Sequence, residues 1–118
     1  ALHTLVVLPL VAALLGGCAH RPTPDQIEAR RGAHLIEHYG CGSCHMIPGI
    51  NGADGLVGPP LIHWSRRTYI AGVLPNDPDN LAFWVQHPQR VIPGVDMPEM
   101  GIKQREAQAI AAYLDAIQ

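Results

Sequence analysis

The chain has few aromatic residues and no cluster of basic ones. Aromatic side chains make up 5% of its 118 residues and include one Phe, which leaves little bulk for a self-sufficient core. Eight Lys and Arg against ten Asp and Glu give a formal net charge of −2, with no basic run. This balance argues against nucleic acid as a partner, which requires a clustered positive surface. Repeats, low-complexity tracts and strand-like alternation are also missing, which favours an all-α domain.

The first nineteen residues contain no Asp, Glu, Lys or Arg. Residues 2–15 are mostly aliphatic, as in the apolar part of a secretory signal or a short membrane span. The segment ends in Leu15-Gly16-Gly17-Cys18, which resembles the lipobox of bacterial lipoproteins, where the cysteine thiol carries a diacylglycerol. An uncleaved anchor helix is the alternative, because the segment approaches the ~20 residues that cross a bilayer.

Both interpretations predict a membrane-anchored protein. We expect residues 1–17 to form a signal peptide or membrane anchor and residues 18–22 to form a tether. Lipidation of Cys18 also accounts for the odd cysteine of the three in the chain. Either arrangement puts the rest of the chain on the outer (periplasmic) face of the cytoplasmic membrane.

The other two cysteines lie in Cys41-Gly42-Ser43-Cys44-His45. The pattern C-x-x-C-H is the attachment site of a c-type haem. Two thiols at this spacing form thioether bonds to the vinyl groups of one porphyrin, and the next residue presents an imidazole nitrogen to the iron. A thioredoxin-like redox pair would need a βαβ context, and a zinc site would need a second cysteine pair or paired histidines. The sequence shows no strand–helix alternation and no other cysteine pair, so we predict one covalent haem c held by Cys41, Cys44 and His45.

Capping signals and apolar periodicity predict the helices. Thr23-Pro24-Asp25-Gln26 is typical of a capping box followed by a helix to about His38 or Tyr39. Further helices are expected over residues 63–71, 77–87 and 103–117, separated by loops rich in Gly and Pro. Gly32 inside the first helix costs ~1 kcal/mol relative to Ala. Close crossing by another helix would explain it.

The second axial ligand is expected from a methionine. Met97 lies in the proline-flanked stretch of residues 93–98, far enough downstream to reach the other face of the porphyrin. Met46 adjoins the proximal ligand and cannot comfortably reach that face, so we interpret it, with Met100, as a packing residue. The histidines that would give bis-His ligation instead are His34, His38, His63 and His87.

From residue 23 to the end, the chain resembles a class I mono-haem cytochrome c of the bacterial membrane-tethered kind. Three segments carry the resemblance: the C-x-x-C-H motif, Gly58-Pro59-Pro60-Leu61 in place of the family's G-P-x-L, and the Ile-Pro-Gly-x-x-Met stretch ending at Met97. It implies a cytochrome c domain over residues 23–118. That fold has three to five short helices around one covalent haem, with its N- and C-terminal helices crossing.

The resemblance also implies roles for single residues. The Pro59 carbonyl would accept a hydrogen bond from Nδ1 of His45, and Leu61 would pack on the haem. Trp84 is a candidate to pack beside the sulfur of Met97. The crossing helices would meet through Gly32 and Ile36 on one side and through Ile110 and Tyr113 on the other.

Axial ligation by His and Met closes the iron to substrates, which favours an electron-transfer protein over an enzyme. The resemblance implies a carrier of single electrons by outer-sphere transfer, from a quinol-oxidising complex or dehydrogenase towards a terminal oxidase. A fixed electron-transfer subunit of a larger respiratory complex has the same chemistry and stays open. A haem enzyme or gas sensor with an open distal site is the rival class.

Overall fold

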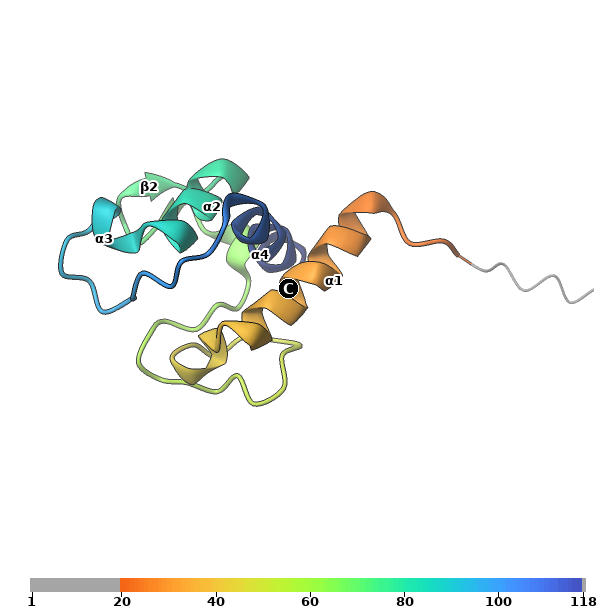
Figure 1. Cartoon of the computed structure of the whole chain (residues 1–118), viewed down its shortest axis with the longest axis horizontal. Helices are drawn as coiled ribbons and strands as arrows, with labels where there is room; N and C mark the ends of the chain where they lie inside the picture. The colour runs from red at the N-terminus through yellow and green to blue at the C-terminus, as the bar shows by residue number, and fades with distance from the viewer. Residues whose placement is uncertain (1–19, 118) are drawn as a thin grey trace, which may run out of the picture.

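The computed structural model describes residues 20–117, and two crossing helices form its centre (Figure 1). They are α1 (Pro24–His38) and α4 (Gln104–Ala116), which pack together more extensively than any other two elements. The helix α2 (Pro78–Gln86) packs on α4, and the short helix α3 (Pro88–Val91) follows it. The expected helical architecture with its first and last helices in contact is therefore confirmed.

Helix α1 begins where its capping signal predicts. The Thr23 hydroxyl accepts a hydrogen bond from the Gln26 backbone N–H at 3.2 Å, and the Gln26 side chain accepts one from the Thr23 N–H at 2.9 Å. Two of the N–H groups left free at a helix start are thereby satisfied. The helix ends at His38, with Tyr39 as its C-cap, and Gly40 turns the chain away with a φ of 70°.

Gly32 lies where α1 crosses α4. It is buried, and a Cβ placed on it would lie 2.0 Å from the Ala109 carbonyl oxygen and 2.9 Å from the Tyr113 Cβ. The two backbones thus approach more closely than any side chain would allow. One turn along α1, Ile36 is 1% exposed and belongs to the core. The other large aliphatic core residues come mainly from α2, α4 and the segments beside them: Ile70, Leu81, Val85, Ile102, Ile110 and Leu114.

Helix α2 is also set by a local signal. The Asp77 carboxylate caps it by accepting from the Asn80 backbone N–H at 2.8 Å, and Pro78 occupies its first turn. Proline fits there because its missing N–H would have no partner within the helix. The predictions for this helix and for the last one, α4, are confirmed to within one or two residues.

The predicted helix over residues 63–71 is wrong. The segment forms a short 3₁₀ turn, η2 (Trp64–Arg66), and then a two-residue strand β1 (Tyr69–Ile70), which pairs antiparallel with β2 (Leu74–Pro75). Residues 71–73 join the strands, with φ values of 50° at Ala71 and 74° at Gly72. Two consecutive residues at positive φ make a tight hairpin turn, which a helix cannot accommodate. Ile70, on β1, is fully buried.

The signal peptide or anchor expected over residues 1–17, and Cys18, lie outside the described residues. Of the tether, residues 20–22 are described and are exposed ahead of α1. Within residues 20–117, no helix combines the length and the apolar character that a membrane crossing requires.

Candidate haem-binding site

The C-x-x-C-H motif forms one helical turn directly after α1. Residues Cys41–Ser43 make the 3₁₀ turn η1, and the Cys41 carbonyl accepts from the N–H groups of Cys44 at 3.2 Å and His45 at 3.0 Å. Side chains three and four positions apart lie on one face of such a turn. The two thiols and the imidazole therefore share a face, which suits attachment to one flat group.

The following loop folds back onto this turn. The Gly55 N–H donates to the Gly42 carbonyl at 3.0 Å, and the Gly58 N–H donates to the Cys44 carbonyl at 2.8 Å. A Cβ on Gly42 would lie 2.7 Å from the Ala53 Cα, and one on Gly55 would lie 2.5 Å from the Cys44 carbonyl carbon. The glycines are thus needed for backbone to lie directly on backbone.

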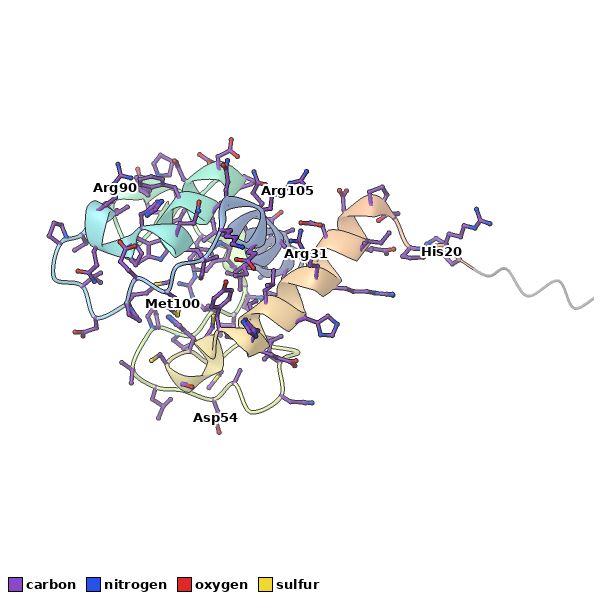
Figure 2. All side chains as sticks on the ribbon, in the orientation of Figure 1. His20, Arg31, Asp54, Arg90, Met100 and Arg105 are labelled. Atoms are coloured by element: carbon purple, nitrogen blue, oxygen red, sulfur yellow. The ribbon has the colours of Figure 1, made fainter. Side chains whose placement is uncertain are left out.

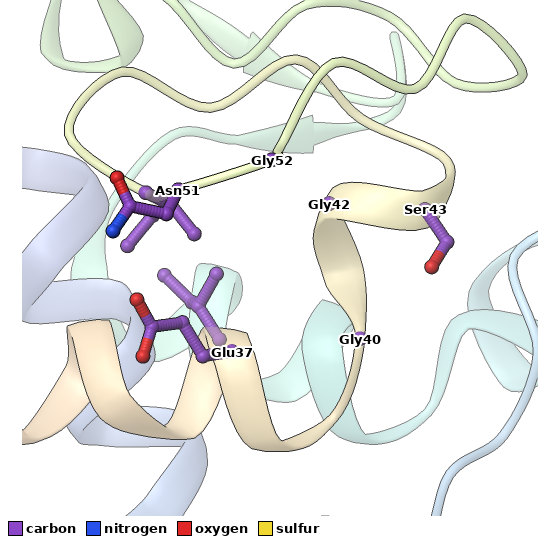
Figure 3. A pocket seen from close by; sticks show the side chains of 8 residues that line it. Glu37, Gly40, Gly42, Ser43, Asn51 and Gly52 are labelled. Atoms are coloured by element: carbon purple, nitrogen blue, oxygen red, sulfur yellow. The ribbon is translucent and has the colours of Figure 1, made fainter.

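A shallow pocket lies between the end of α1 and this loop (Figure 3). Figure 3 shows the Glu37 and Asn51 side chains on one side of the pocket and Ser43 away from them, across Gly40 and Gly42. Much of the lining is glycine backbone. The pocket contains neither motif cysteine nor His45, so it is not the space in which the motif would hold a cofactor.

His45 has a defined tautomer. Its Nδ1 lies 2.8 Å from the Pro59 carbonyl oxygen, and a carbonyl can only accept, so Nδ1 carries the proton. The lone pair of a neutral ring is then on Nε2, the nitrogen available to a metal. Gly58 lies against the ring, since a Cβ there would be 2.3 Å from the His45 Cε1. The ring is held by one hydrogen bond and one close backbone contact.

Both motif cysteines are half-buried free thiols. Burial raises the pKa of the Cys41 thiol. Within residues 20–117, no three His, Cys, Asp or Glu side chains gather in the way a metal ion would need. Two free thiols and a single imidazole within five consecutive residues are the groups through which a haem c attaches.

Side chains that the sequence did not single out for this role bind the Pro59–Pro60 segment and its neighbours. The Arg67 guanidinium donates to the Pro60 carbonyl and lies 4.8 Å from the centre of the Trp64 ring. Asn76 accepts from the Trp64 indole N–H at 3.1 Å and donates to the Arg67 carbonyl at 2.9 Å. These contacts hold the segment that carries the Pro59 carbonyl, which accepts the hydrogen bond from His45.

Leu61 and Trp84 both pack against the core, from different segments of the chain. Leu61 directly follows the proline pair, its N–H donates to the Met46 carbonyl at 2.8 Å, and its half-buried side chain packs on the core. Trp84 is half-buried on α2 and packs against the same core. Leu61 is thus tied to the motif through the residue next to His45, whereas Trp84 approaches from α2.

Met97 lies on the segment between α3 and α4, and its side chain is half-buried. Met100, labelled in Figure 2, lies further along the same segment and packs against the core. The Gln89 side chain on α3 donates to the Met97 carbonyl at 2.9 Å. The sequence offered no signal for Gln89, because a polar residue on a four-residue helix belongs to no motif or periodic pattern.

A polar contact joins the end of α1 to the start of α4. The Tyr39 hydroxyl donates to the Glu106 carboxylate at 2.7 Å, and the same carboxylate accepts from the Lys103 backbone N–H at 2.9 Å. The bond from Lys103, followed by the one from Tyr39, lowers the pKa of Glu106. The bond to Glu106 in turn raises the pKa of Tyr39. The end of α1 is thereby tied to the start of α4, two residues before Cys41.

Comparison with known proteins agrees with this geometry. The family model described as "Cytochrome c" matches residues 29–118. The cytochrome c oxidase subunit 2 of Alkalihalophilus pseudofirmus is 30% identical over 103 residues, which are 86% of this chain and 29% of that protein. The subunit of the same name in Bacillus subtilis is 27% identical over 96 residues, 80% of this chain and 27% of that protein.

The chain spans less than a third of these relatives, so they are comparable with it over one domain alone. The family match, in contrast, covers most of α1 and continues through the motif, the proline pair and α4. This family implies a covalent haem c. The two thiols and the His45 imidazole, with Gly58 packed against the ring, fit such a group. The chain belongs to the cytochrome c family.

Proposed function

We propose that this chain is a class I mono-haem cytochrome c that carries single electrons by outer-sphere transfer. The observation that carries the proposal is His45, whose Nδ1 is engaged by the Pro59 carbonyl at 2.8 Å and whose Nε2 is left free to bind iron. When bound, haem c supplies a one-electron iron couple. Cys41 and Cys44 would hold it through thioether bonds, with His45 and Met97 as the axial ligands.

The remaining residues tune and shield this site. A hydrogen bond to the far nitrogen of a ligating histidine fixes its orientation and raises its basicity, which is the role we assign to Pro59. Leu61 and Trp84 would exclude water from the two sides of the site. A methionine thioether favours the reduced state relative to a second histidine. With both axial positions filled by protein, the site has no place for a substrate, as an electron carrier requires.

We further propose a tether and partners. Lipidation of Cys18, or an anchor formed by residues 1–17, would hold the domain on the outer face of the cytoplasmic membrane. A quinol-oxidising complex or dehydrogenase would be the donor and a terminal oxidase the acceptor. Both relatives named above are subunits of cytochrome c oxidase, which supports an oxidase as the partner.

A second candidate is a fixed electron-transfer part of a larger respiratory complex. Both relatives are oxidase subunits, and each is more than three times as long as the region that matches this chain. In them the matched domain is thus part of a larger oxidase subunit, which favours this candidate. The two candidates differ in their behaviour on purification from native membranes. A carrier separates from the oxidase in mild detergent and high salt, whereas a fixed subunit stays with it in constant proportion. Intact mass measurement of the same sample reports whether Cys18 carries acyl chains.

The axial ligand is tested by two methionine variants of the haem-loaded protein. We expect the ferric wild type to show the far-red sulfur-to-iron band, Met97→Ala to lose it, and Met100→Ala to keep it. A band that survives in Met97→Ala contradicts this ligand. A high-spin wild type whose spectrum shifts readily with cyanide or carbon monoxide favours the haem enzyme or gas sensor instead.

A further inference from the structure

The segment that carries Met97 has little backbone structure of its own. We call residues 92–101 the Met97 loop. It begins with a tight turn in which the Val95 N–H donates to the Ile92 carbonyl at 3.1 Å and Gly94 has a φ of 82°. Pro93 followed by Gly94 is the preferred pair for such a turn. Beyond it, residues 96–101 make no backbone–backbone hydrogen bond within the described part of the chain.

One side chain replaces the missing backbone contacts. The Gln89 Nε2 donates to the Val95 carbonyl at 2.6 Å and to the Met97 carbonyl at 2.9 Å, and its Oε1 accepts from the Gly94 N–H at 3.0 Å. Both donors of the amide are thus used, and so is its oxygen. All three bonds reach the Met97 loop, and one ends on the carbonyl of Met97 itself.

The helix α3 that carries Gln89 is itself held in place. Pro88 at the start of α3 is buried, and its carbonyl accepts from the Ile92 N–H at 2.9 Å. Figure 1 shows α3 where the Met97 loop begins, and the loop then running below α2 towards α4. At the loop's far end, Gln86 on α2 donates to the Ile102 carbonyl at 3.1 Å. Gln86 is half-buried like Gln89, but its bond ends on Ile102, beyond the loop, so of the two glutamines Gln89 alone bonds within it.

We propose that Gln89 is a positioning residue for the sixth ligand, holding the Met97 backbone so that its sulfur stays in place in both oxidation states. This inference rests on the proposed role of Met97 as the axial ligand. A small anion such as cyanide binds the iron only after the methionine has left. The rigidity of the Met97 loop therefore sets how readily the iron opens. A neutral amide performs this task without change of charge across the working pH range.

The test compares Gln89→Leu with Gln86→Leu in the haem-loaded protein. Leucine is similar in size to glutamine and cannot make these hydrogen bonds. Removing three bonds at residue 89 is expected to raise the apparent affinity of ferric iron for cyanide about tenfold or more. The matched control at residue 86 loses a single bond outside the Met97 loop and is expected to stay within about twofold of wild type. Cyanide affinity unchanged in Gln89→Leu, or raised equally in both variants, overturns the inference.

A second readout separates this inference from the proposed axial ligand. Amide hydrogen exchange at Gly94 reports the bond to Gln89 whichever residue ligates the iron, and we expect it to accelerate about tenfold in Gln89→Leu. If wild type binds cyanide readily, Met97 is not the axial ligand, and the positioning role of Gln89 fails with it. Faster exchange of the Gly94 amide in Gln89→Leu would then show only that Gln89 holds the loop. Should Gln89→Leu not load haem, Gln89→Glu serves instead. It keeps the acceptor for Gly94 but sets a carboxylate oxygen against the carbonyls of Val95 and Met97, so its cyanide affinity should rise at least as far as expected for Gln89→Leu, and an unchanged affinity overturns the inference.

Discussion

Replacing Gly32 by Ala sets helix propensity against helix packing. Propensity alone predicts a gain of ~1 kcal/mol, because Gly is the weaker helix former. The new Cβ, however, would lie 2.0 Å from the Ala109 carbonyl oxygen, where contacts under 3.0 Å essentially never occur. The neighbour is α4 backbone, which cannot turn aside as a side chain can. Helix α4 would have to withdraw by about 1 Å, and overpacking of this kind costs ~1–3 kcal/mol.

Because the obstacle is backbone, we place the cost at the upper end of that range and expect a net loss of ~2 kcal/mol. In a domain of this size that corresponds to a fall in Tm of about 10 °C. Thermal and guanidinium unfolding of the haem-loaded protein, followed by far-UV circular dichroism, measures it. Arg30→Ala, at an exposed position of α1, is the control and should stay within ~0.5 kcal/mol of wild type. A Gly32→Ala variant as stable as wild type, or more stable, would refute the close crossing.

Four further perturbations test the site and the helices around it. The pKa of Glu106 is lowered from 4.5, so its carboxylate stabilises the fold above that pH and this contribution is lost as the pH falls further. The urea midpoint of Glu106→Gln should therefore fall less steeply with acid than the midpoint of wild type. The pKa of Tyr39 is raised from 10.0, so its contribution disappears above that pH, and Tyr39→Phe should remove this alkaline loss. Gly58→Ala would place a Cβ 2.3 Å from the His45 ring and should lower the yield of haem-loaded protein, measured by haem stain against total protein; a normal yield and spectrum would contradict the contact. Asp77→Ala removes the cap of α2 and should cost ~1 kcal/mol in urea unfolding, whereas an equal loss in Asp77→Asn would speak against capping.

Much of the fold could be predicted because its signals are local. The capping box at Thr23 and the cap at Asp77 act within one helical turn, so the sequence alone locates the starts of α1 and α2. Gly32 can also be read from the sequence, because a glycine destabilises a helix interior by its own residue type and a close helix crossing explains its presence there. The C-x-x-C-H motif is local too, and five consecutive residues define it.

The errors and omissions depend on contacts between distant segments. Ala71 adopts a positive φ, which nothing in its own residue type predicts, and the buried Ile70 beside it is held by tertiary packing. Likewise, Gln89 and Arg67 matter through the carbonyls they reach on other segments, Met97 and Pro60. Polar side chains of this kind carry no periodicity, so only the folded chain reveals their partners.

The central claim is that iron held by this chain is closed on both faces by protein ligands. The most direct test is the absorption spectrum of the ferrous, haem-loaded protein before and after addition of carbon monoxide. Ligation by His45 and Met97 predicts a low-spin spectrum that carbon monoxide leaves unchanged at neutral pH. Prompt conversion to a carbon monoxide-bound spectrum would contradict the account.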